Sequence, residues 1–369
     1  MKFIHTADWH LSASTLYGVD ADSGLPIRLK DAENSISYLV DFAIENKVDF
    51  VLHCGDVTDS GNPDEAVRRV FSGSIVRLLE AGISFYCISG NHDLFRGDNW
   101  LKSAEILARH KNFRVYEKPV VKKIKNALLR MVPYGSYDMG AFFKKSSWKE
   151  SGGAKFSVLA SHLGINEGVI GANEVKFNTG YSYKEFSGYD YVALGHYHRC
   201  QQIENVFYSG SLLIHDFGER KEKKGFLFYD DGDVKFIENE KDRSFVMFSN
   251  RHFIEKSYDN EKFKSYDLRN KYKKKLSGAI VKVSLSLKGS LINKVSAWHI
   301  EKQIMKAGAV KVLFDLSFSK GNKKEDNDNS GKLIDFSEAL VLYCEELGIN
   351  EKDFINAGKK LLIEGLANV

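Results

Sequence analysis

Side chains able to bind metal ions occur in five separate clusters within the first 200 residues of the chain. The clusters are Asp8-Trp9-His10, Gly55-Asp56-Val57-Thr58-Asp59, Gly90-Asn91-His92-Asp93, Ser161-His162 and Gly195-His196-Tyr197-His198. They supply carboxylate, imidazole and amide groups, which are common ligands of divalent metals. Any one cluster occurs by chance as a polar turn. Five that each follow an apolar run indicate one assembled metal site.

The residue types in these clusters predict a pair of metal ions. Two such ions, roughly 3.5–4 Å apart, clamp both the attacking and the leaving oxygen of an in-line phosphoryl displacement. Because the two cations repel each other, we expect one carboxylate, that of Asp56, to bridge them. The other ligands divide into two sets, with Asp8, His10 and His198 on one ion and Asn91, His162 and His196 on the other. This ligand mixture suits Mn²⁺, Fe²⁺ or Zn²⁺ better than Ca²⁺.

The predicted catalytic residues are His92 and Asp93. His92 is displaced by one residue from the predicted ligand Asn91, which favours a general acid or a phosphate-contacting cation over a further ligand. Asp93 would hold the ring of His92 or its loop. Gly90 would end the preceding strand and make the turn.

An alternation of apolar runs and amphipathic segments predicts an α/β fold that can position these residues. We expect strands over 2–7, 48–54 and 83–88, alternating with a helix over 28–46 and another that opens at Pro63. This order implies a parallel sheet with helices on its faces and a site at the carboxyl ends of its strands. Apolar runs at 156–160 and 189–194, followed by a hairpin over 225–238, predict a second, mixed or antiparallel sheet packed against the first.

The composition is that of an ordinary globular protein, and at 369 residues the chain has room for two or three domains. Its net charge of +4 permits a polyanionic partner without requiring one. The four cysteines show no Cys-x-x-Cys spacing, which indicates buried free thiols in a reducing compartment. No signal-peptide segment and no membrane-spanning run is evident, so we expect a cytoplasmic protein with no membrane partner.

The character of the sequence changes after about residue 245. A strand–helix–strand pattern over 279–318 predicts a small α+β module, and the Lys- and Tyr-rich stretch 256–275 suits either phosphate backbones and stacked bases or a solvated helix face. The expected domains are 1–244, a capping or DNA-binding domain over 245–318, a flexible linker over 319–331, and a helix–loop–helix over 332–369.

The five clusters, in this order, resemble the calcineurin-like metallophosphoesterase superfamily, and within it most closely the SbcD-type DNA nuclease subunits of bacteria and phages. The surrounding sequences Thr6-Ala7-Asp8-Trp9-His10-Leu11, Met131-Val132-Pro133-Tyr134 and Tyr208-Ser209-Gly210-Ser211 strengthen the resemblance, which covers residues 1 to about 240. It implies a four-layer sandwich of two packed mixed β-sheets flanked by helices, with a small α+β capping domain and a C-terminal helical tail.

The resemblance implies a DNA nuclease with two Mn²⁺ ions, or Mg²⁺, Fe²⁺ or Zn²⁺ in their place. Its activities would be a 3′→5′ double-strand exonuclease and a single-strand endonuclease in break repair and recombination, associated with the nucleoid or in the host cytoplasm if phage-encoded. The implied partners are DNA ends, an SbcC-type SMC-like ATPase bound through 332–369, and a second copy of the chain. Helices near 64–79 and 100–109 would form that homodimer, although their apolar stripes equally allow burial within one monomer, as the tail helices allow folding back onto the body.

The segment Thr58-Asp59-Ser60 departs from the motifs of related families. It lacks the arginine of Ser/Thr phosphatases, which argues against that class of enzyme. Some nuclease relatives carry His at the position of Asp59, so we place Asp59 in the second sphere of the metal site. The alternatives are another binuclear phosphodiesterase or phosphatase and a non-catalytic scaffold on the same fold. His5 and His53, inside apolar strands, are predicted to be core residues with satisfied hydrogen bonds. His215 lies in a loop that the resemblance places near the site, and an ordinary loop residue is favoured there over a role in a substrate loop.

Overall fold

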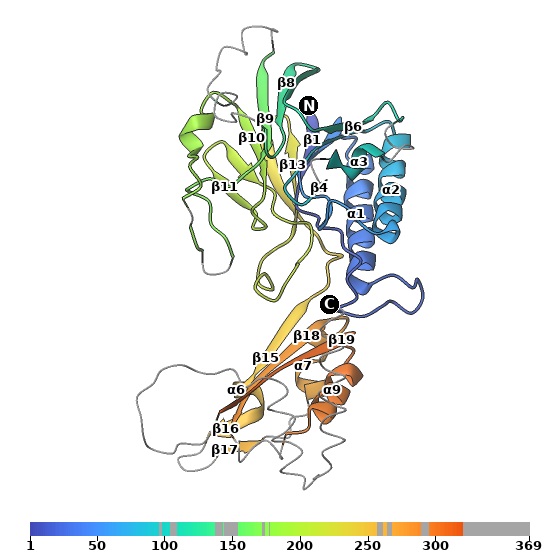
Figure 1. Cartoon of the computed structure of the whole chain (residues 1–369), viewed down its shortest axis with the longest axis vertical. Helices are drawn as coiled ribbons and strands as arrows, with labels where there is room; N and C mark the ends of the chain where they lie inside the picture. Colours follow the sequence, from blue (N-terminus) through green and yellow to red (C-terminus); the bar gives the residue numbers. More distant parts are fainter. Residues whose placement is uncertain are drawn as a thin grey trace. The chain divides into compact units, whose positions relative to one another are not determined.

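The structure is a computed structural model, and it describes residues 1–95, 98–103, 109–136, 143, 154–171, 174–176, 178–256, 261–263, 268–288 and 295–319. The chain divides into two compact units (Figure 1). The first contains Met1–Val246 and Gly278–Ile280, and the second contains Met247–Ser277 and Val281–Val369. Within the described residues, no helix is both long and apolar enough to cross a membrane.

A six-stranded sheet in the first unit carries the strands that precede the first three clusters, in the order β14-β13-β1-β2-β3-β6. Its strands are β1 (Lys2–Thr6), β2 (Phe50–Cys54), β3 (Ser84–Ile88), β6 (Phe113–Tyr116), β13 (Gly225–Asp230) and β14 (Asp233–Glu238). Strands β1, β2 and β3 are parallel, as predicted, and β6 extends this parallel arrangement.

The hairpin β13–β14 joins this first sheet, so its expected place in a second sheet is wrong. Strand β13 pairs antiparallel with β1. Phe226 and Phe228 on one face of β13 pack edge-on against the Phe42 ring, with centroids 5.3 and 5.2 Å away. Leu227 and Tyr229 on the other face are buried in the core between the two sheets. Because both faces of β13 are covered, this strand fits the interior of the first sheet, and β14 forms its edge.

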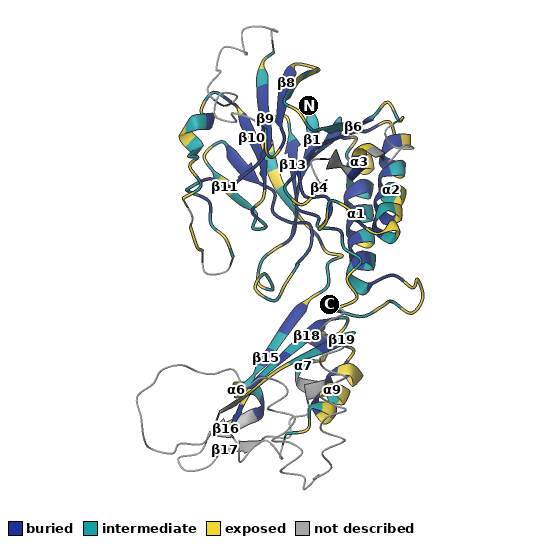
Figure 2. Cartoon of the chain, viewed as in Figure 1, coloured by how far each residue is buried: buried dark blue, intermediate teal, exposed yellow. Residues whose placement is uncertain are grey.

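The second sheet is mixed, as expected, and has the strand order β11-β12-β10-β9-β8-β7. Its strands are β7 (Val120–Ile124), β8 (Ala127–Val132), β9 (Phe156–His162), β10 (Tyr191–Gly195), β11 (Gln201–Ile203) and β12 (Val206–Tyr208). The inner four are parallel, and the edge strands β7 and β11 are antiparallel to their neighbours. Phe3 of the first sheet packs edge-on against Tyr191 of the second at 5.4 Å, within the shared core. Figure 2 shows that the central strands of both sheets are largely buried.

Helices α1 (Ile27–Glu45) and α2 (Glu65–Glu80) cover the other face of the first sheet. The apolar stripe of α2, which includes Val67, Val70 and Phe71, is buried in this monomer, where each fully buried side chain stabilises the fold by about 1.5–3 kcal/mol. The stripe therefore serves the core. Next along the chain come β4 (Leu94–Phe95), β5 (Asp98–Asn99) and α3 (Trp100–Ser103), and residues 104–108 of the predicted third helix lie outside the described residues.

On the outer face of the second sheet, the short 3₁₀ helix η2 (Tyr183–Phe186) buries Phe186. Two packed mixed sheets flanked by helices are the predicted fold, which is confirmed.

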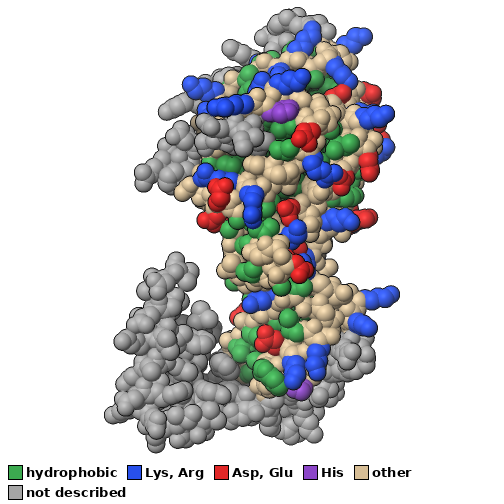
Figure 3. Space-filling view, turned by 90° about the vertical axis from the view of Figure 1, so that its right-hand side faces the viewer, with side chains coloured by type: hydrophobic (Ala, Val, Ile, Leu, Met, Phe, Trp, Pro, Cys, Tyr) green, Lys and Arg blue, Asp and Glu red, His purple; other side chains and the backbone are tan. Residues whose placement is uncertain are grey.

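The surface over α1 and α2 intersperses Lys and Arg with Asp and Glu (Figure 3), as in the ion pair between Arg77 and Asp41 at 2.6 Å. This surface therefore lacks the single-sign patch typical of a nucleic-acid interface.

The second unit contains most of a three-stranded sheet of β15 (Phe245–Ser249), β18 (Ile280–Lys288) and β19 (Lys311–Ser319). Its other elements are α6 (Asn250–Phe253), β16 (Ile254–Lys256), β17 (Glu261–Phe263), α7 (Leu268–Leu276) and α9 (Ala297–Lys306). The sequence β18-α9-β19 is the strand–helix–strand pattern expected over 279–318. Tyr272 of the Lys- and Tyr-rich stretch packs edge-on against Phe248 at 5.2 Å, so this ring serves packing. Ser319 ends β19, and both 320–331 and the tail 332–369 lie outside the described residues.

His5 and His53 lie in the core, as predicted. His5 contacts the Tyr191 hydroxyl through Nδ1 at 3.1 Å and the Leu194 carbonyl through Nε2 at 3.2 Å. His53 has its Nδ1 3.9 Å from Cys87 Sγ, but its Nε2 has no hydrogen-bond partner in the described part of the chain. The prediction that the hydrogen bonds of His53 are satisfied is therefore confirmed for Nδ1 only. Burial lowers the pKa of both rings to about 3.

These two histidines predict that acid destabilises the metal-free protein. Their ordinary pKa of 6.5 exceeds the folded value of about 3, so at intermediate pH only the unfolded chain takes up the protons. Stability is thus lost as pH falls below 6.5, by about 2 kcal/mol per histidine at pH 5. Urea unfolding at pH 7 and pH 5 measures the loss, and His53→Leu should make it about 2 kcal/mol smaller. An equal loss in both proteins would contradict the assignment.

Candidate metal centre

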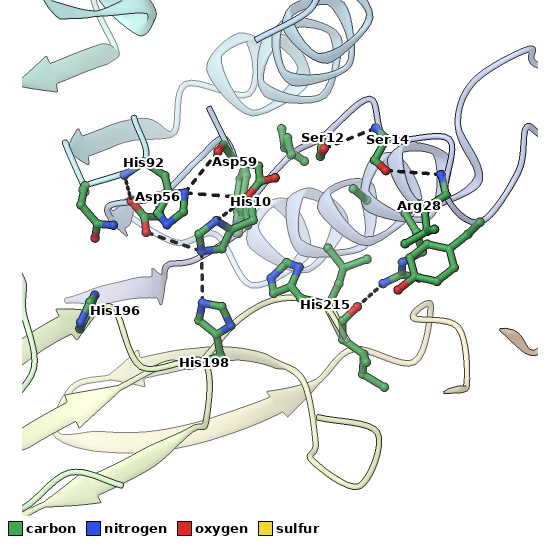
Figure 4. A pocket seen from close by; sticks show the side chains of 18 residues that line it. His10, Ser12, Ser14, Arg28, Asp56, Asp59, His92, His196, His198 and His215 are labelled. Carbon is green, nitrogen blue, oxygen red and sulfur yellow. Dashed lines mark hydrogen bonds and ion pairs between the residues drawn. The ribbon is translucent and has the colours of Figure 1, made fainter. Parts of the chain in front are cut away.

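The five predicted clusters converge at the carboxyl ends of strands from both sheets. Figure 4 shows His10, Asp56, His92, His196 and His198 around one pocket. Asp8 and His10 follow β1, Asp56 follows β2, and Asn91 follows β3, whereas His162 ends β9 and His196 and His198 follow β10. The two sheets therefore contribute opposite sides of a single site. This explains why ligands more than 180 positions apart in the sequence can meet.

Two groups of candidate ligands share the carboxylate of Asp8 at the centre of the site. Potential ligand atoms of Asp8, His10 and His198 lie within 4.8 Å of one another, as do those of Asp8, Asp56 and His162. Asp56 Oδ2 is 3.6 Å from His10 Nε2 and 3.3 Å from His162 Nε2, so it lies between the two groups. This is the position that the predicted bridging role requires.

Two remaining candidate ligands complete the second group. The Asn91 side-chain oxygen is 3.0 Å from His162 Nε2. The backbone N–H of His196 donates to the Asp8 carboxylate at 3.0 Å, and its ring centroid lies 5.3 Å from that of His162. The structure therefore brings all seven predicted metal ligands together, with Asp8 as a second carboxylate near both groups.

The imidazoles are oriented as metal ligands require. His162 Nδ1 is 2.8 Å from the Cys54 carbonyl oxygen, which can only accept, so Nδ1 carries a proton and Nε2 faces the site. His10 Nδ1 faces Asp59 Oδ1 at 3.6 Å, while its Nε2 lies 3.1 Å from His198 Nε2. An outward partner on Nδ1 and an inward Nε2 are typical of metal-binding histidines. The donor set thus fits a metal centre.

Four residues of the site adopt the left-handed backbone conformation that non-glycine residues avoid. Their φ angles are 53° for Asp8, 43° for His10, 57° for Asp56 and 95° for His196. Such conformations cost on the order of 1–3 kcal/mol each and are concentrated at functional sites. Backbone hydrogen bonds hold them, for example from His10 N to the Asp56 carbonyl at 3.1 Å.

Gly90 serves close packing rather than an unusual turn, because its φ is not in the left-handed region. A Cβ atom at this position would lie 2.1 Å from Asp56 Oδ1. Gly90 thus lets the β3 loop approach Asp56. The sequence suggested the turn because it contains no signal for such an approach.

Asp93 is fully buried and holds the loops after β2 and β3 together. Its Oδ2 accepts from the backbone N–H groups of Asp56 at 2.8 Å and Gly90 at 2.9 Å, and its Oδ1 accepts from those of Val57 and Thr58 at 2.8 and 3.1 Å. Of the two roles expected for Asp93, these contacts favour bracing the loop. The expected contact with the His92 ring is instead made by Asp59, whose carbonyl oxygen lies 3.2 Å from His92 Nδ1.

His92 is open to solvent, with 42% of its side chain exposed. Its backbone N–H donates to Asp56 Oδ1 at 2.8 Å, and its ring meets that of His10 edge-on at 4.7 Å. The ring therefore stands beside the candidate ligands and faces the opening, where a substrate would arrive.

Comparison with known proteins decides the family. Residues 1–200 match the calcineurin-like phosphoesterase family. The chain belongs to this family. It is a metal-dependent phosphoesterase, and the resemblance drawn from its motifs is confirmed.

Two curated relatives of this phosphoesterase are each 29% identical to it over 257 residues. A subunit of the SbcCD nuclease of Staphylococcus saprophyticus aligns over 61% of this chain and 64% of its own length. The uncharacterized metallophosphoesterase YhaO of Bacillus subtilis aligns over 64% of this chain and 59% of its own length. The chain thus matches less than two thirds of either relative.

Solved structures similar to this phosphoesterase include two with low sequence identity. Purple acid phosphatase PPD1 from yellow lupin is 12% identical, with a TM-score of 0.42 over 64% of this chain and 49% of that one. TT1561 of Thermus thermophilus is 11% identical, with a TM-score of 0.40 over 65% and 99% of the two chains.

The phosphoesterase site extends into a cavity of about 440 Å³, which the sequence did not predict. His215 lines it, with Nε2 3.1 Å from the Asp8 carbonyl oxygen and its ring 5.0 Å from those of His10 and His198. The favoured expectation, an ordinary loop residue, is wrong for His215, and its place in the cavity agrees with the alternative of a substrate loop. Its place in the site could have been predicted, because His215 comes a few residues after β12 and the other clusters also follow strands.

The charges of the site favour a cation. Burial alone would lower the pKa of His162, but the hydrogen bond and charge of Asp56 raise it to about 9. Although burial opposes it, contact with His162 and His10 holds the pKa of Asp56 well below its usual range. For His10, burial is outweighed by Asp59, Asp8 and Asp56, which raise its pKa. The carboxylates thus stabilise positive charge in a largely buried place, which a metal ion would supply.

Proposed function

We propose that the protein is an SbcD-type DNA nuclease that uses two Mn²⁺ ions, acting as a 3′→5′ double-strand exonuclease and a single-strand endonuclease. The observation that carries the proposal is Asp56 Oδ2, which lies 3.6 Å from one candidate ligand set at His10 and 3.3 Å from the other at His162. A relative described as part of a nuclease supports DNA as the substrate.

The proposed reaction divides the work between the ligands and His92. Asp8, His10, Asp56 and His198 would hold one ion, and Asp56, Asn91, His162 and His196 the other. When bound, the ions would polarise the scissile phosphate and lower the pKa of a water molecule to about 7. His92 reaches the opening and would protonate the leaving oxygen or neutralise the phosphate. Asp59, beside His92 Nδ1, would orient that ring.

A cleavage assay tests the proposal. Linear duplexes labelled at either the 3′ or the 5′ end, and circular single strands, would be incubated with the protein and Mn²⁺, Mg²⁺, Fe²⁺ or Zn²⁺. We expect Mn²⁺ to support loss of the 3′ label and nicking of the circle. Hydrolysis of bis-p-nitrophenyl phosphate without any DNA cleavage would instead support a small-molecule phosphodiesterase. Failure on both substrates would support a scaffold.

We further propose that residues 332–369, which lie outside the described residues, bind an SbcC-type ATPase. Deleting them is expected to abolish co-purification with a coexpressed ATPase partner. Because the deletion leaves the candidate metal centre intact, Mn²⁺-dependent cleavage of short single strands should be unchanged. A deletion protein that still binds the ATPase would refute the role of the tail. One that loses cleavage as well would show that the tail supports the first unit.

A further inference from the structure

Glu219 lies in the loop between β12 and β13 and is buried against His198. Its Oε1 is 2.7 Å from His198 Nδ1, and its side chain is only 12% exposed. We propose that Glu219 is a positioning residue that fixes the tautomer and orientation of His198, so that His198 Nε2 is free to bind a metal ion. The proposal rests on the proposed metal centre and is independent of whether DNA is the substrate.

Two groups hold the carboxylate of Glu219 in place. Oε2 accepts from the backbone N–H of His215 at 2.9 Å and pairs with Lys224 Nζ at 3.0 Å. Lys224 is only 2% exposed, and its Nζ also donates to the His198 carbonyl oxygen at 3.0 Å. The loop therefore holds His198 at two points, with Glu219 on the ring and Lys224 on the backbone. Oε1 is left to serve the ring alone.

The contact decides which ring nitrogen carries the proton. A neutral imidazole has one N–H, and a carboxylate can only accept, so the proton must be on His198 Nδ1. Nε2 then carries no proton, and its lone pair is free to bind a metal ion. It lies 3.1 Å from His10 Nε2, so the two nitrogens converge on one place at the centre of the site.

Glu219 differs from the partners of the other two oriented histidines. His162 is held by a backbone carbonyl, that of Cys54, which no substitution removes. Asp59 is 3.6 Å from His10 Nδ1 and is 55% exposed, so its contact is longer and shared with solvent. Among these three histidines, only His198 depends on a buried side-chain acceptor. Its orientation can therefore be tested by one substitution.

Glu219→Gln is expected to reverse the tautomer of His198. Lys224 Nζ and His215 N–H both need an acceptor, so the amide oxygen should face them and the amide NH₂ should face His198 Nδ1. His198 Nδ1 would then accept, and the proton would move to Nε2, where it blocks metal binding. Loss of such an outer partner typically weakens metal affinity by about 10–100-fold.

Glu222→Gln is the matched control, because Glu222 also pairs with Lys224 Nζ, at 2.9 Å, through a carboxylate that faces the lysine. Both substitutions remove one negative charge beside Lys224, but only the first changes the partner of His198. We would record the ring ¹⁵N spectrum of His198 in the metal-free protein and titrate Mn²⁺ calorimetrically. The Nε2–H pattern and weaker binding at one of two sites are expected for Glu219→Gln alone.

Several outcomes would overturn the proposal. An unchanged ring spectrum and unchanged Mn²⁺ affinity in Glu219→Gln would do so, as would equal losses in both variants, which would assign the effect to Lys224. If Glu219→Gln does not fold, Glu219→Asp keeps the charge but shortens the reach, and it should weaken Mn²⁺ binding without a new tautomer pattern. Unchanged binding there would also refute the role. No DNA is needed, so a protein that binds Mn²⁺ but does not cleave DNA would refute only the nuclease proposal.

Discussion

Replacing Asp56 by asparagine is expected to reduce Mn²⁺-dependent phosphodiester cleavage by about a thousandfold, because stabilisation by metal ions is worth several kcal/mol. The side chain keeps its size but loses the charge that faces His10 and His162 at 3.6 and 3.3 Å. Without that charge the two cations would repel each other across a neutral amide, and at least one should dissociate.

Cleavage rate and bound manganese should therefore fall together in Asp56→Asn. Both are measurable, by gel assay and by mass spectrometry of the metal content. Asp41→Asn is a suitable control, since Asp41 is a carboxylate on α1 whose ion-pair partner, Arg77, is also half-exposed on the surface. Full cleavage by Asp56→Asn would remove the basis for the two-ion assignment.

Replacing His92 by glutamine is expected to lower kcat by about 10²–10⁴-fold, the usual contribution of a positioned proton donor, while both ions remain bound. His92 supplies only its backbone N–H to Asp56, at 2.8 Å, and glutamine keeps that donor. The exposed ring is what the substitution removes. A lower kcat with unchanged metal content would distinguish His92 from a metal ligand, because loss of a ligand would lower both.

Single-turnover cleavage with saturating Mn²⁺, together with the metal content, measures both quantities for His92→Gln. His299→Gln changes an exposed histidine on α9 and should leave both unchanged. If His92→Gln protein loses manganese, the residue is a ligand and the assignment of the proton donor fails.

The sequence predicted the candidate ligands because each follows a buried strand. Parallel strands deliver their carboxyl ends to one edge, so Asp8, Asp56 and Asn91 had to meet once β1, β2 and β3 were recognised. Apolar runs of five or six residues that are followed by Gly or Asp strongly indicate a buried strand that ends in a loop. Apolar runs later in the chain located His162 and His196 in the same way.

Other features depended on contacts between distant segments. Nothing within 225–238 specifies that this hairpin pairs with β1, since the partner is more than 200 residues away. The roles of Glu219 and His215 depend on the path of an irregular loop, which has no periodicity to interpret. Gly90 looked like a turn residue because the approach of Asp56 is visible only in three dimensions.

The position of β1 between β2 and β13 has a consequence for how the chain is synthesised. One edge of β1 can pair with β2 as soon as about fifty residues have left the ribosome, but the other waits for Gly225–Asp230. Until then a buried-type strand exposes unpaired backbone groups, which promotes association with other chains. A nascent chain that stalls at residue 200, although it contains every candidate ligand, should therefore need a chaperone to stay unaggregated.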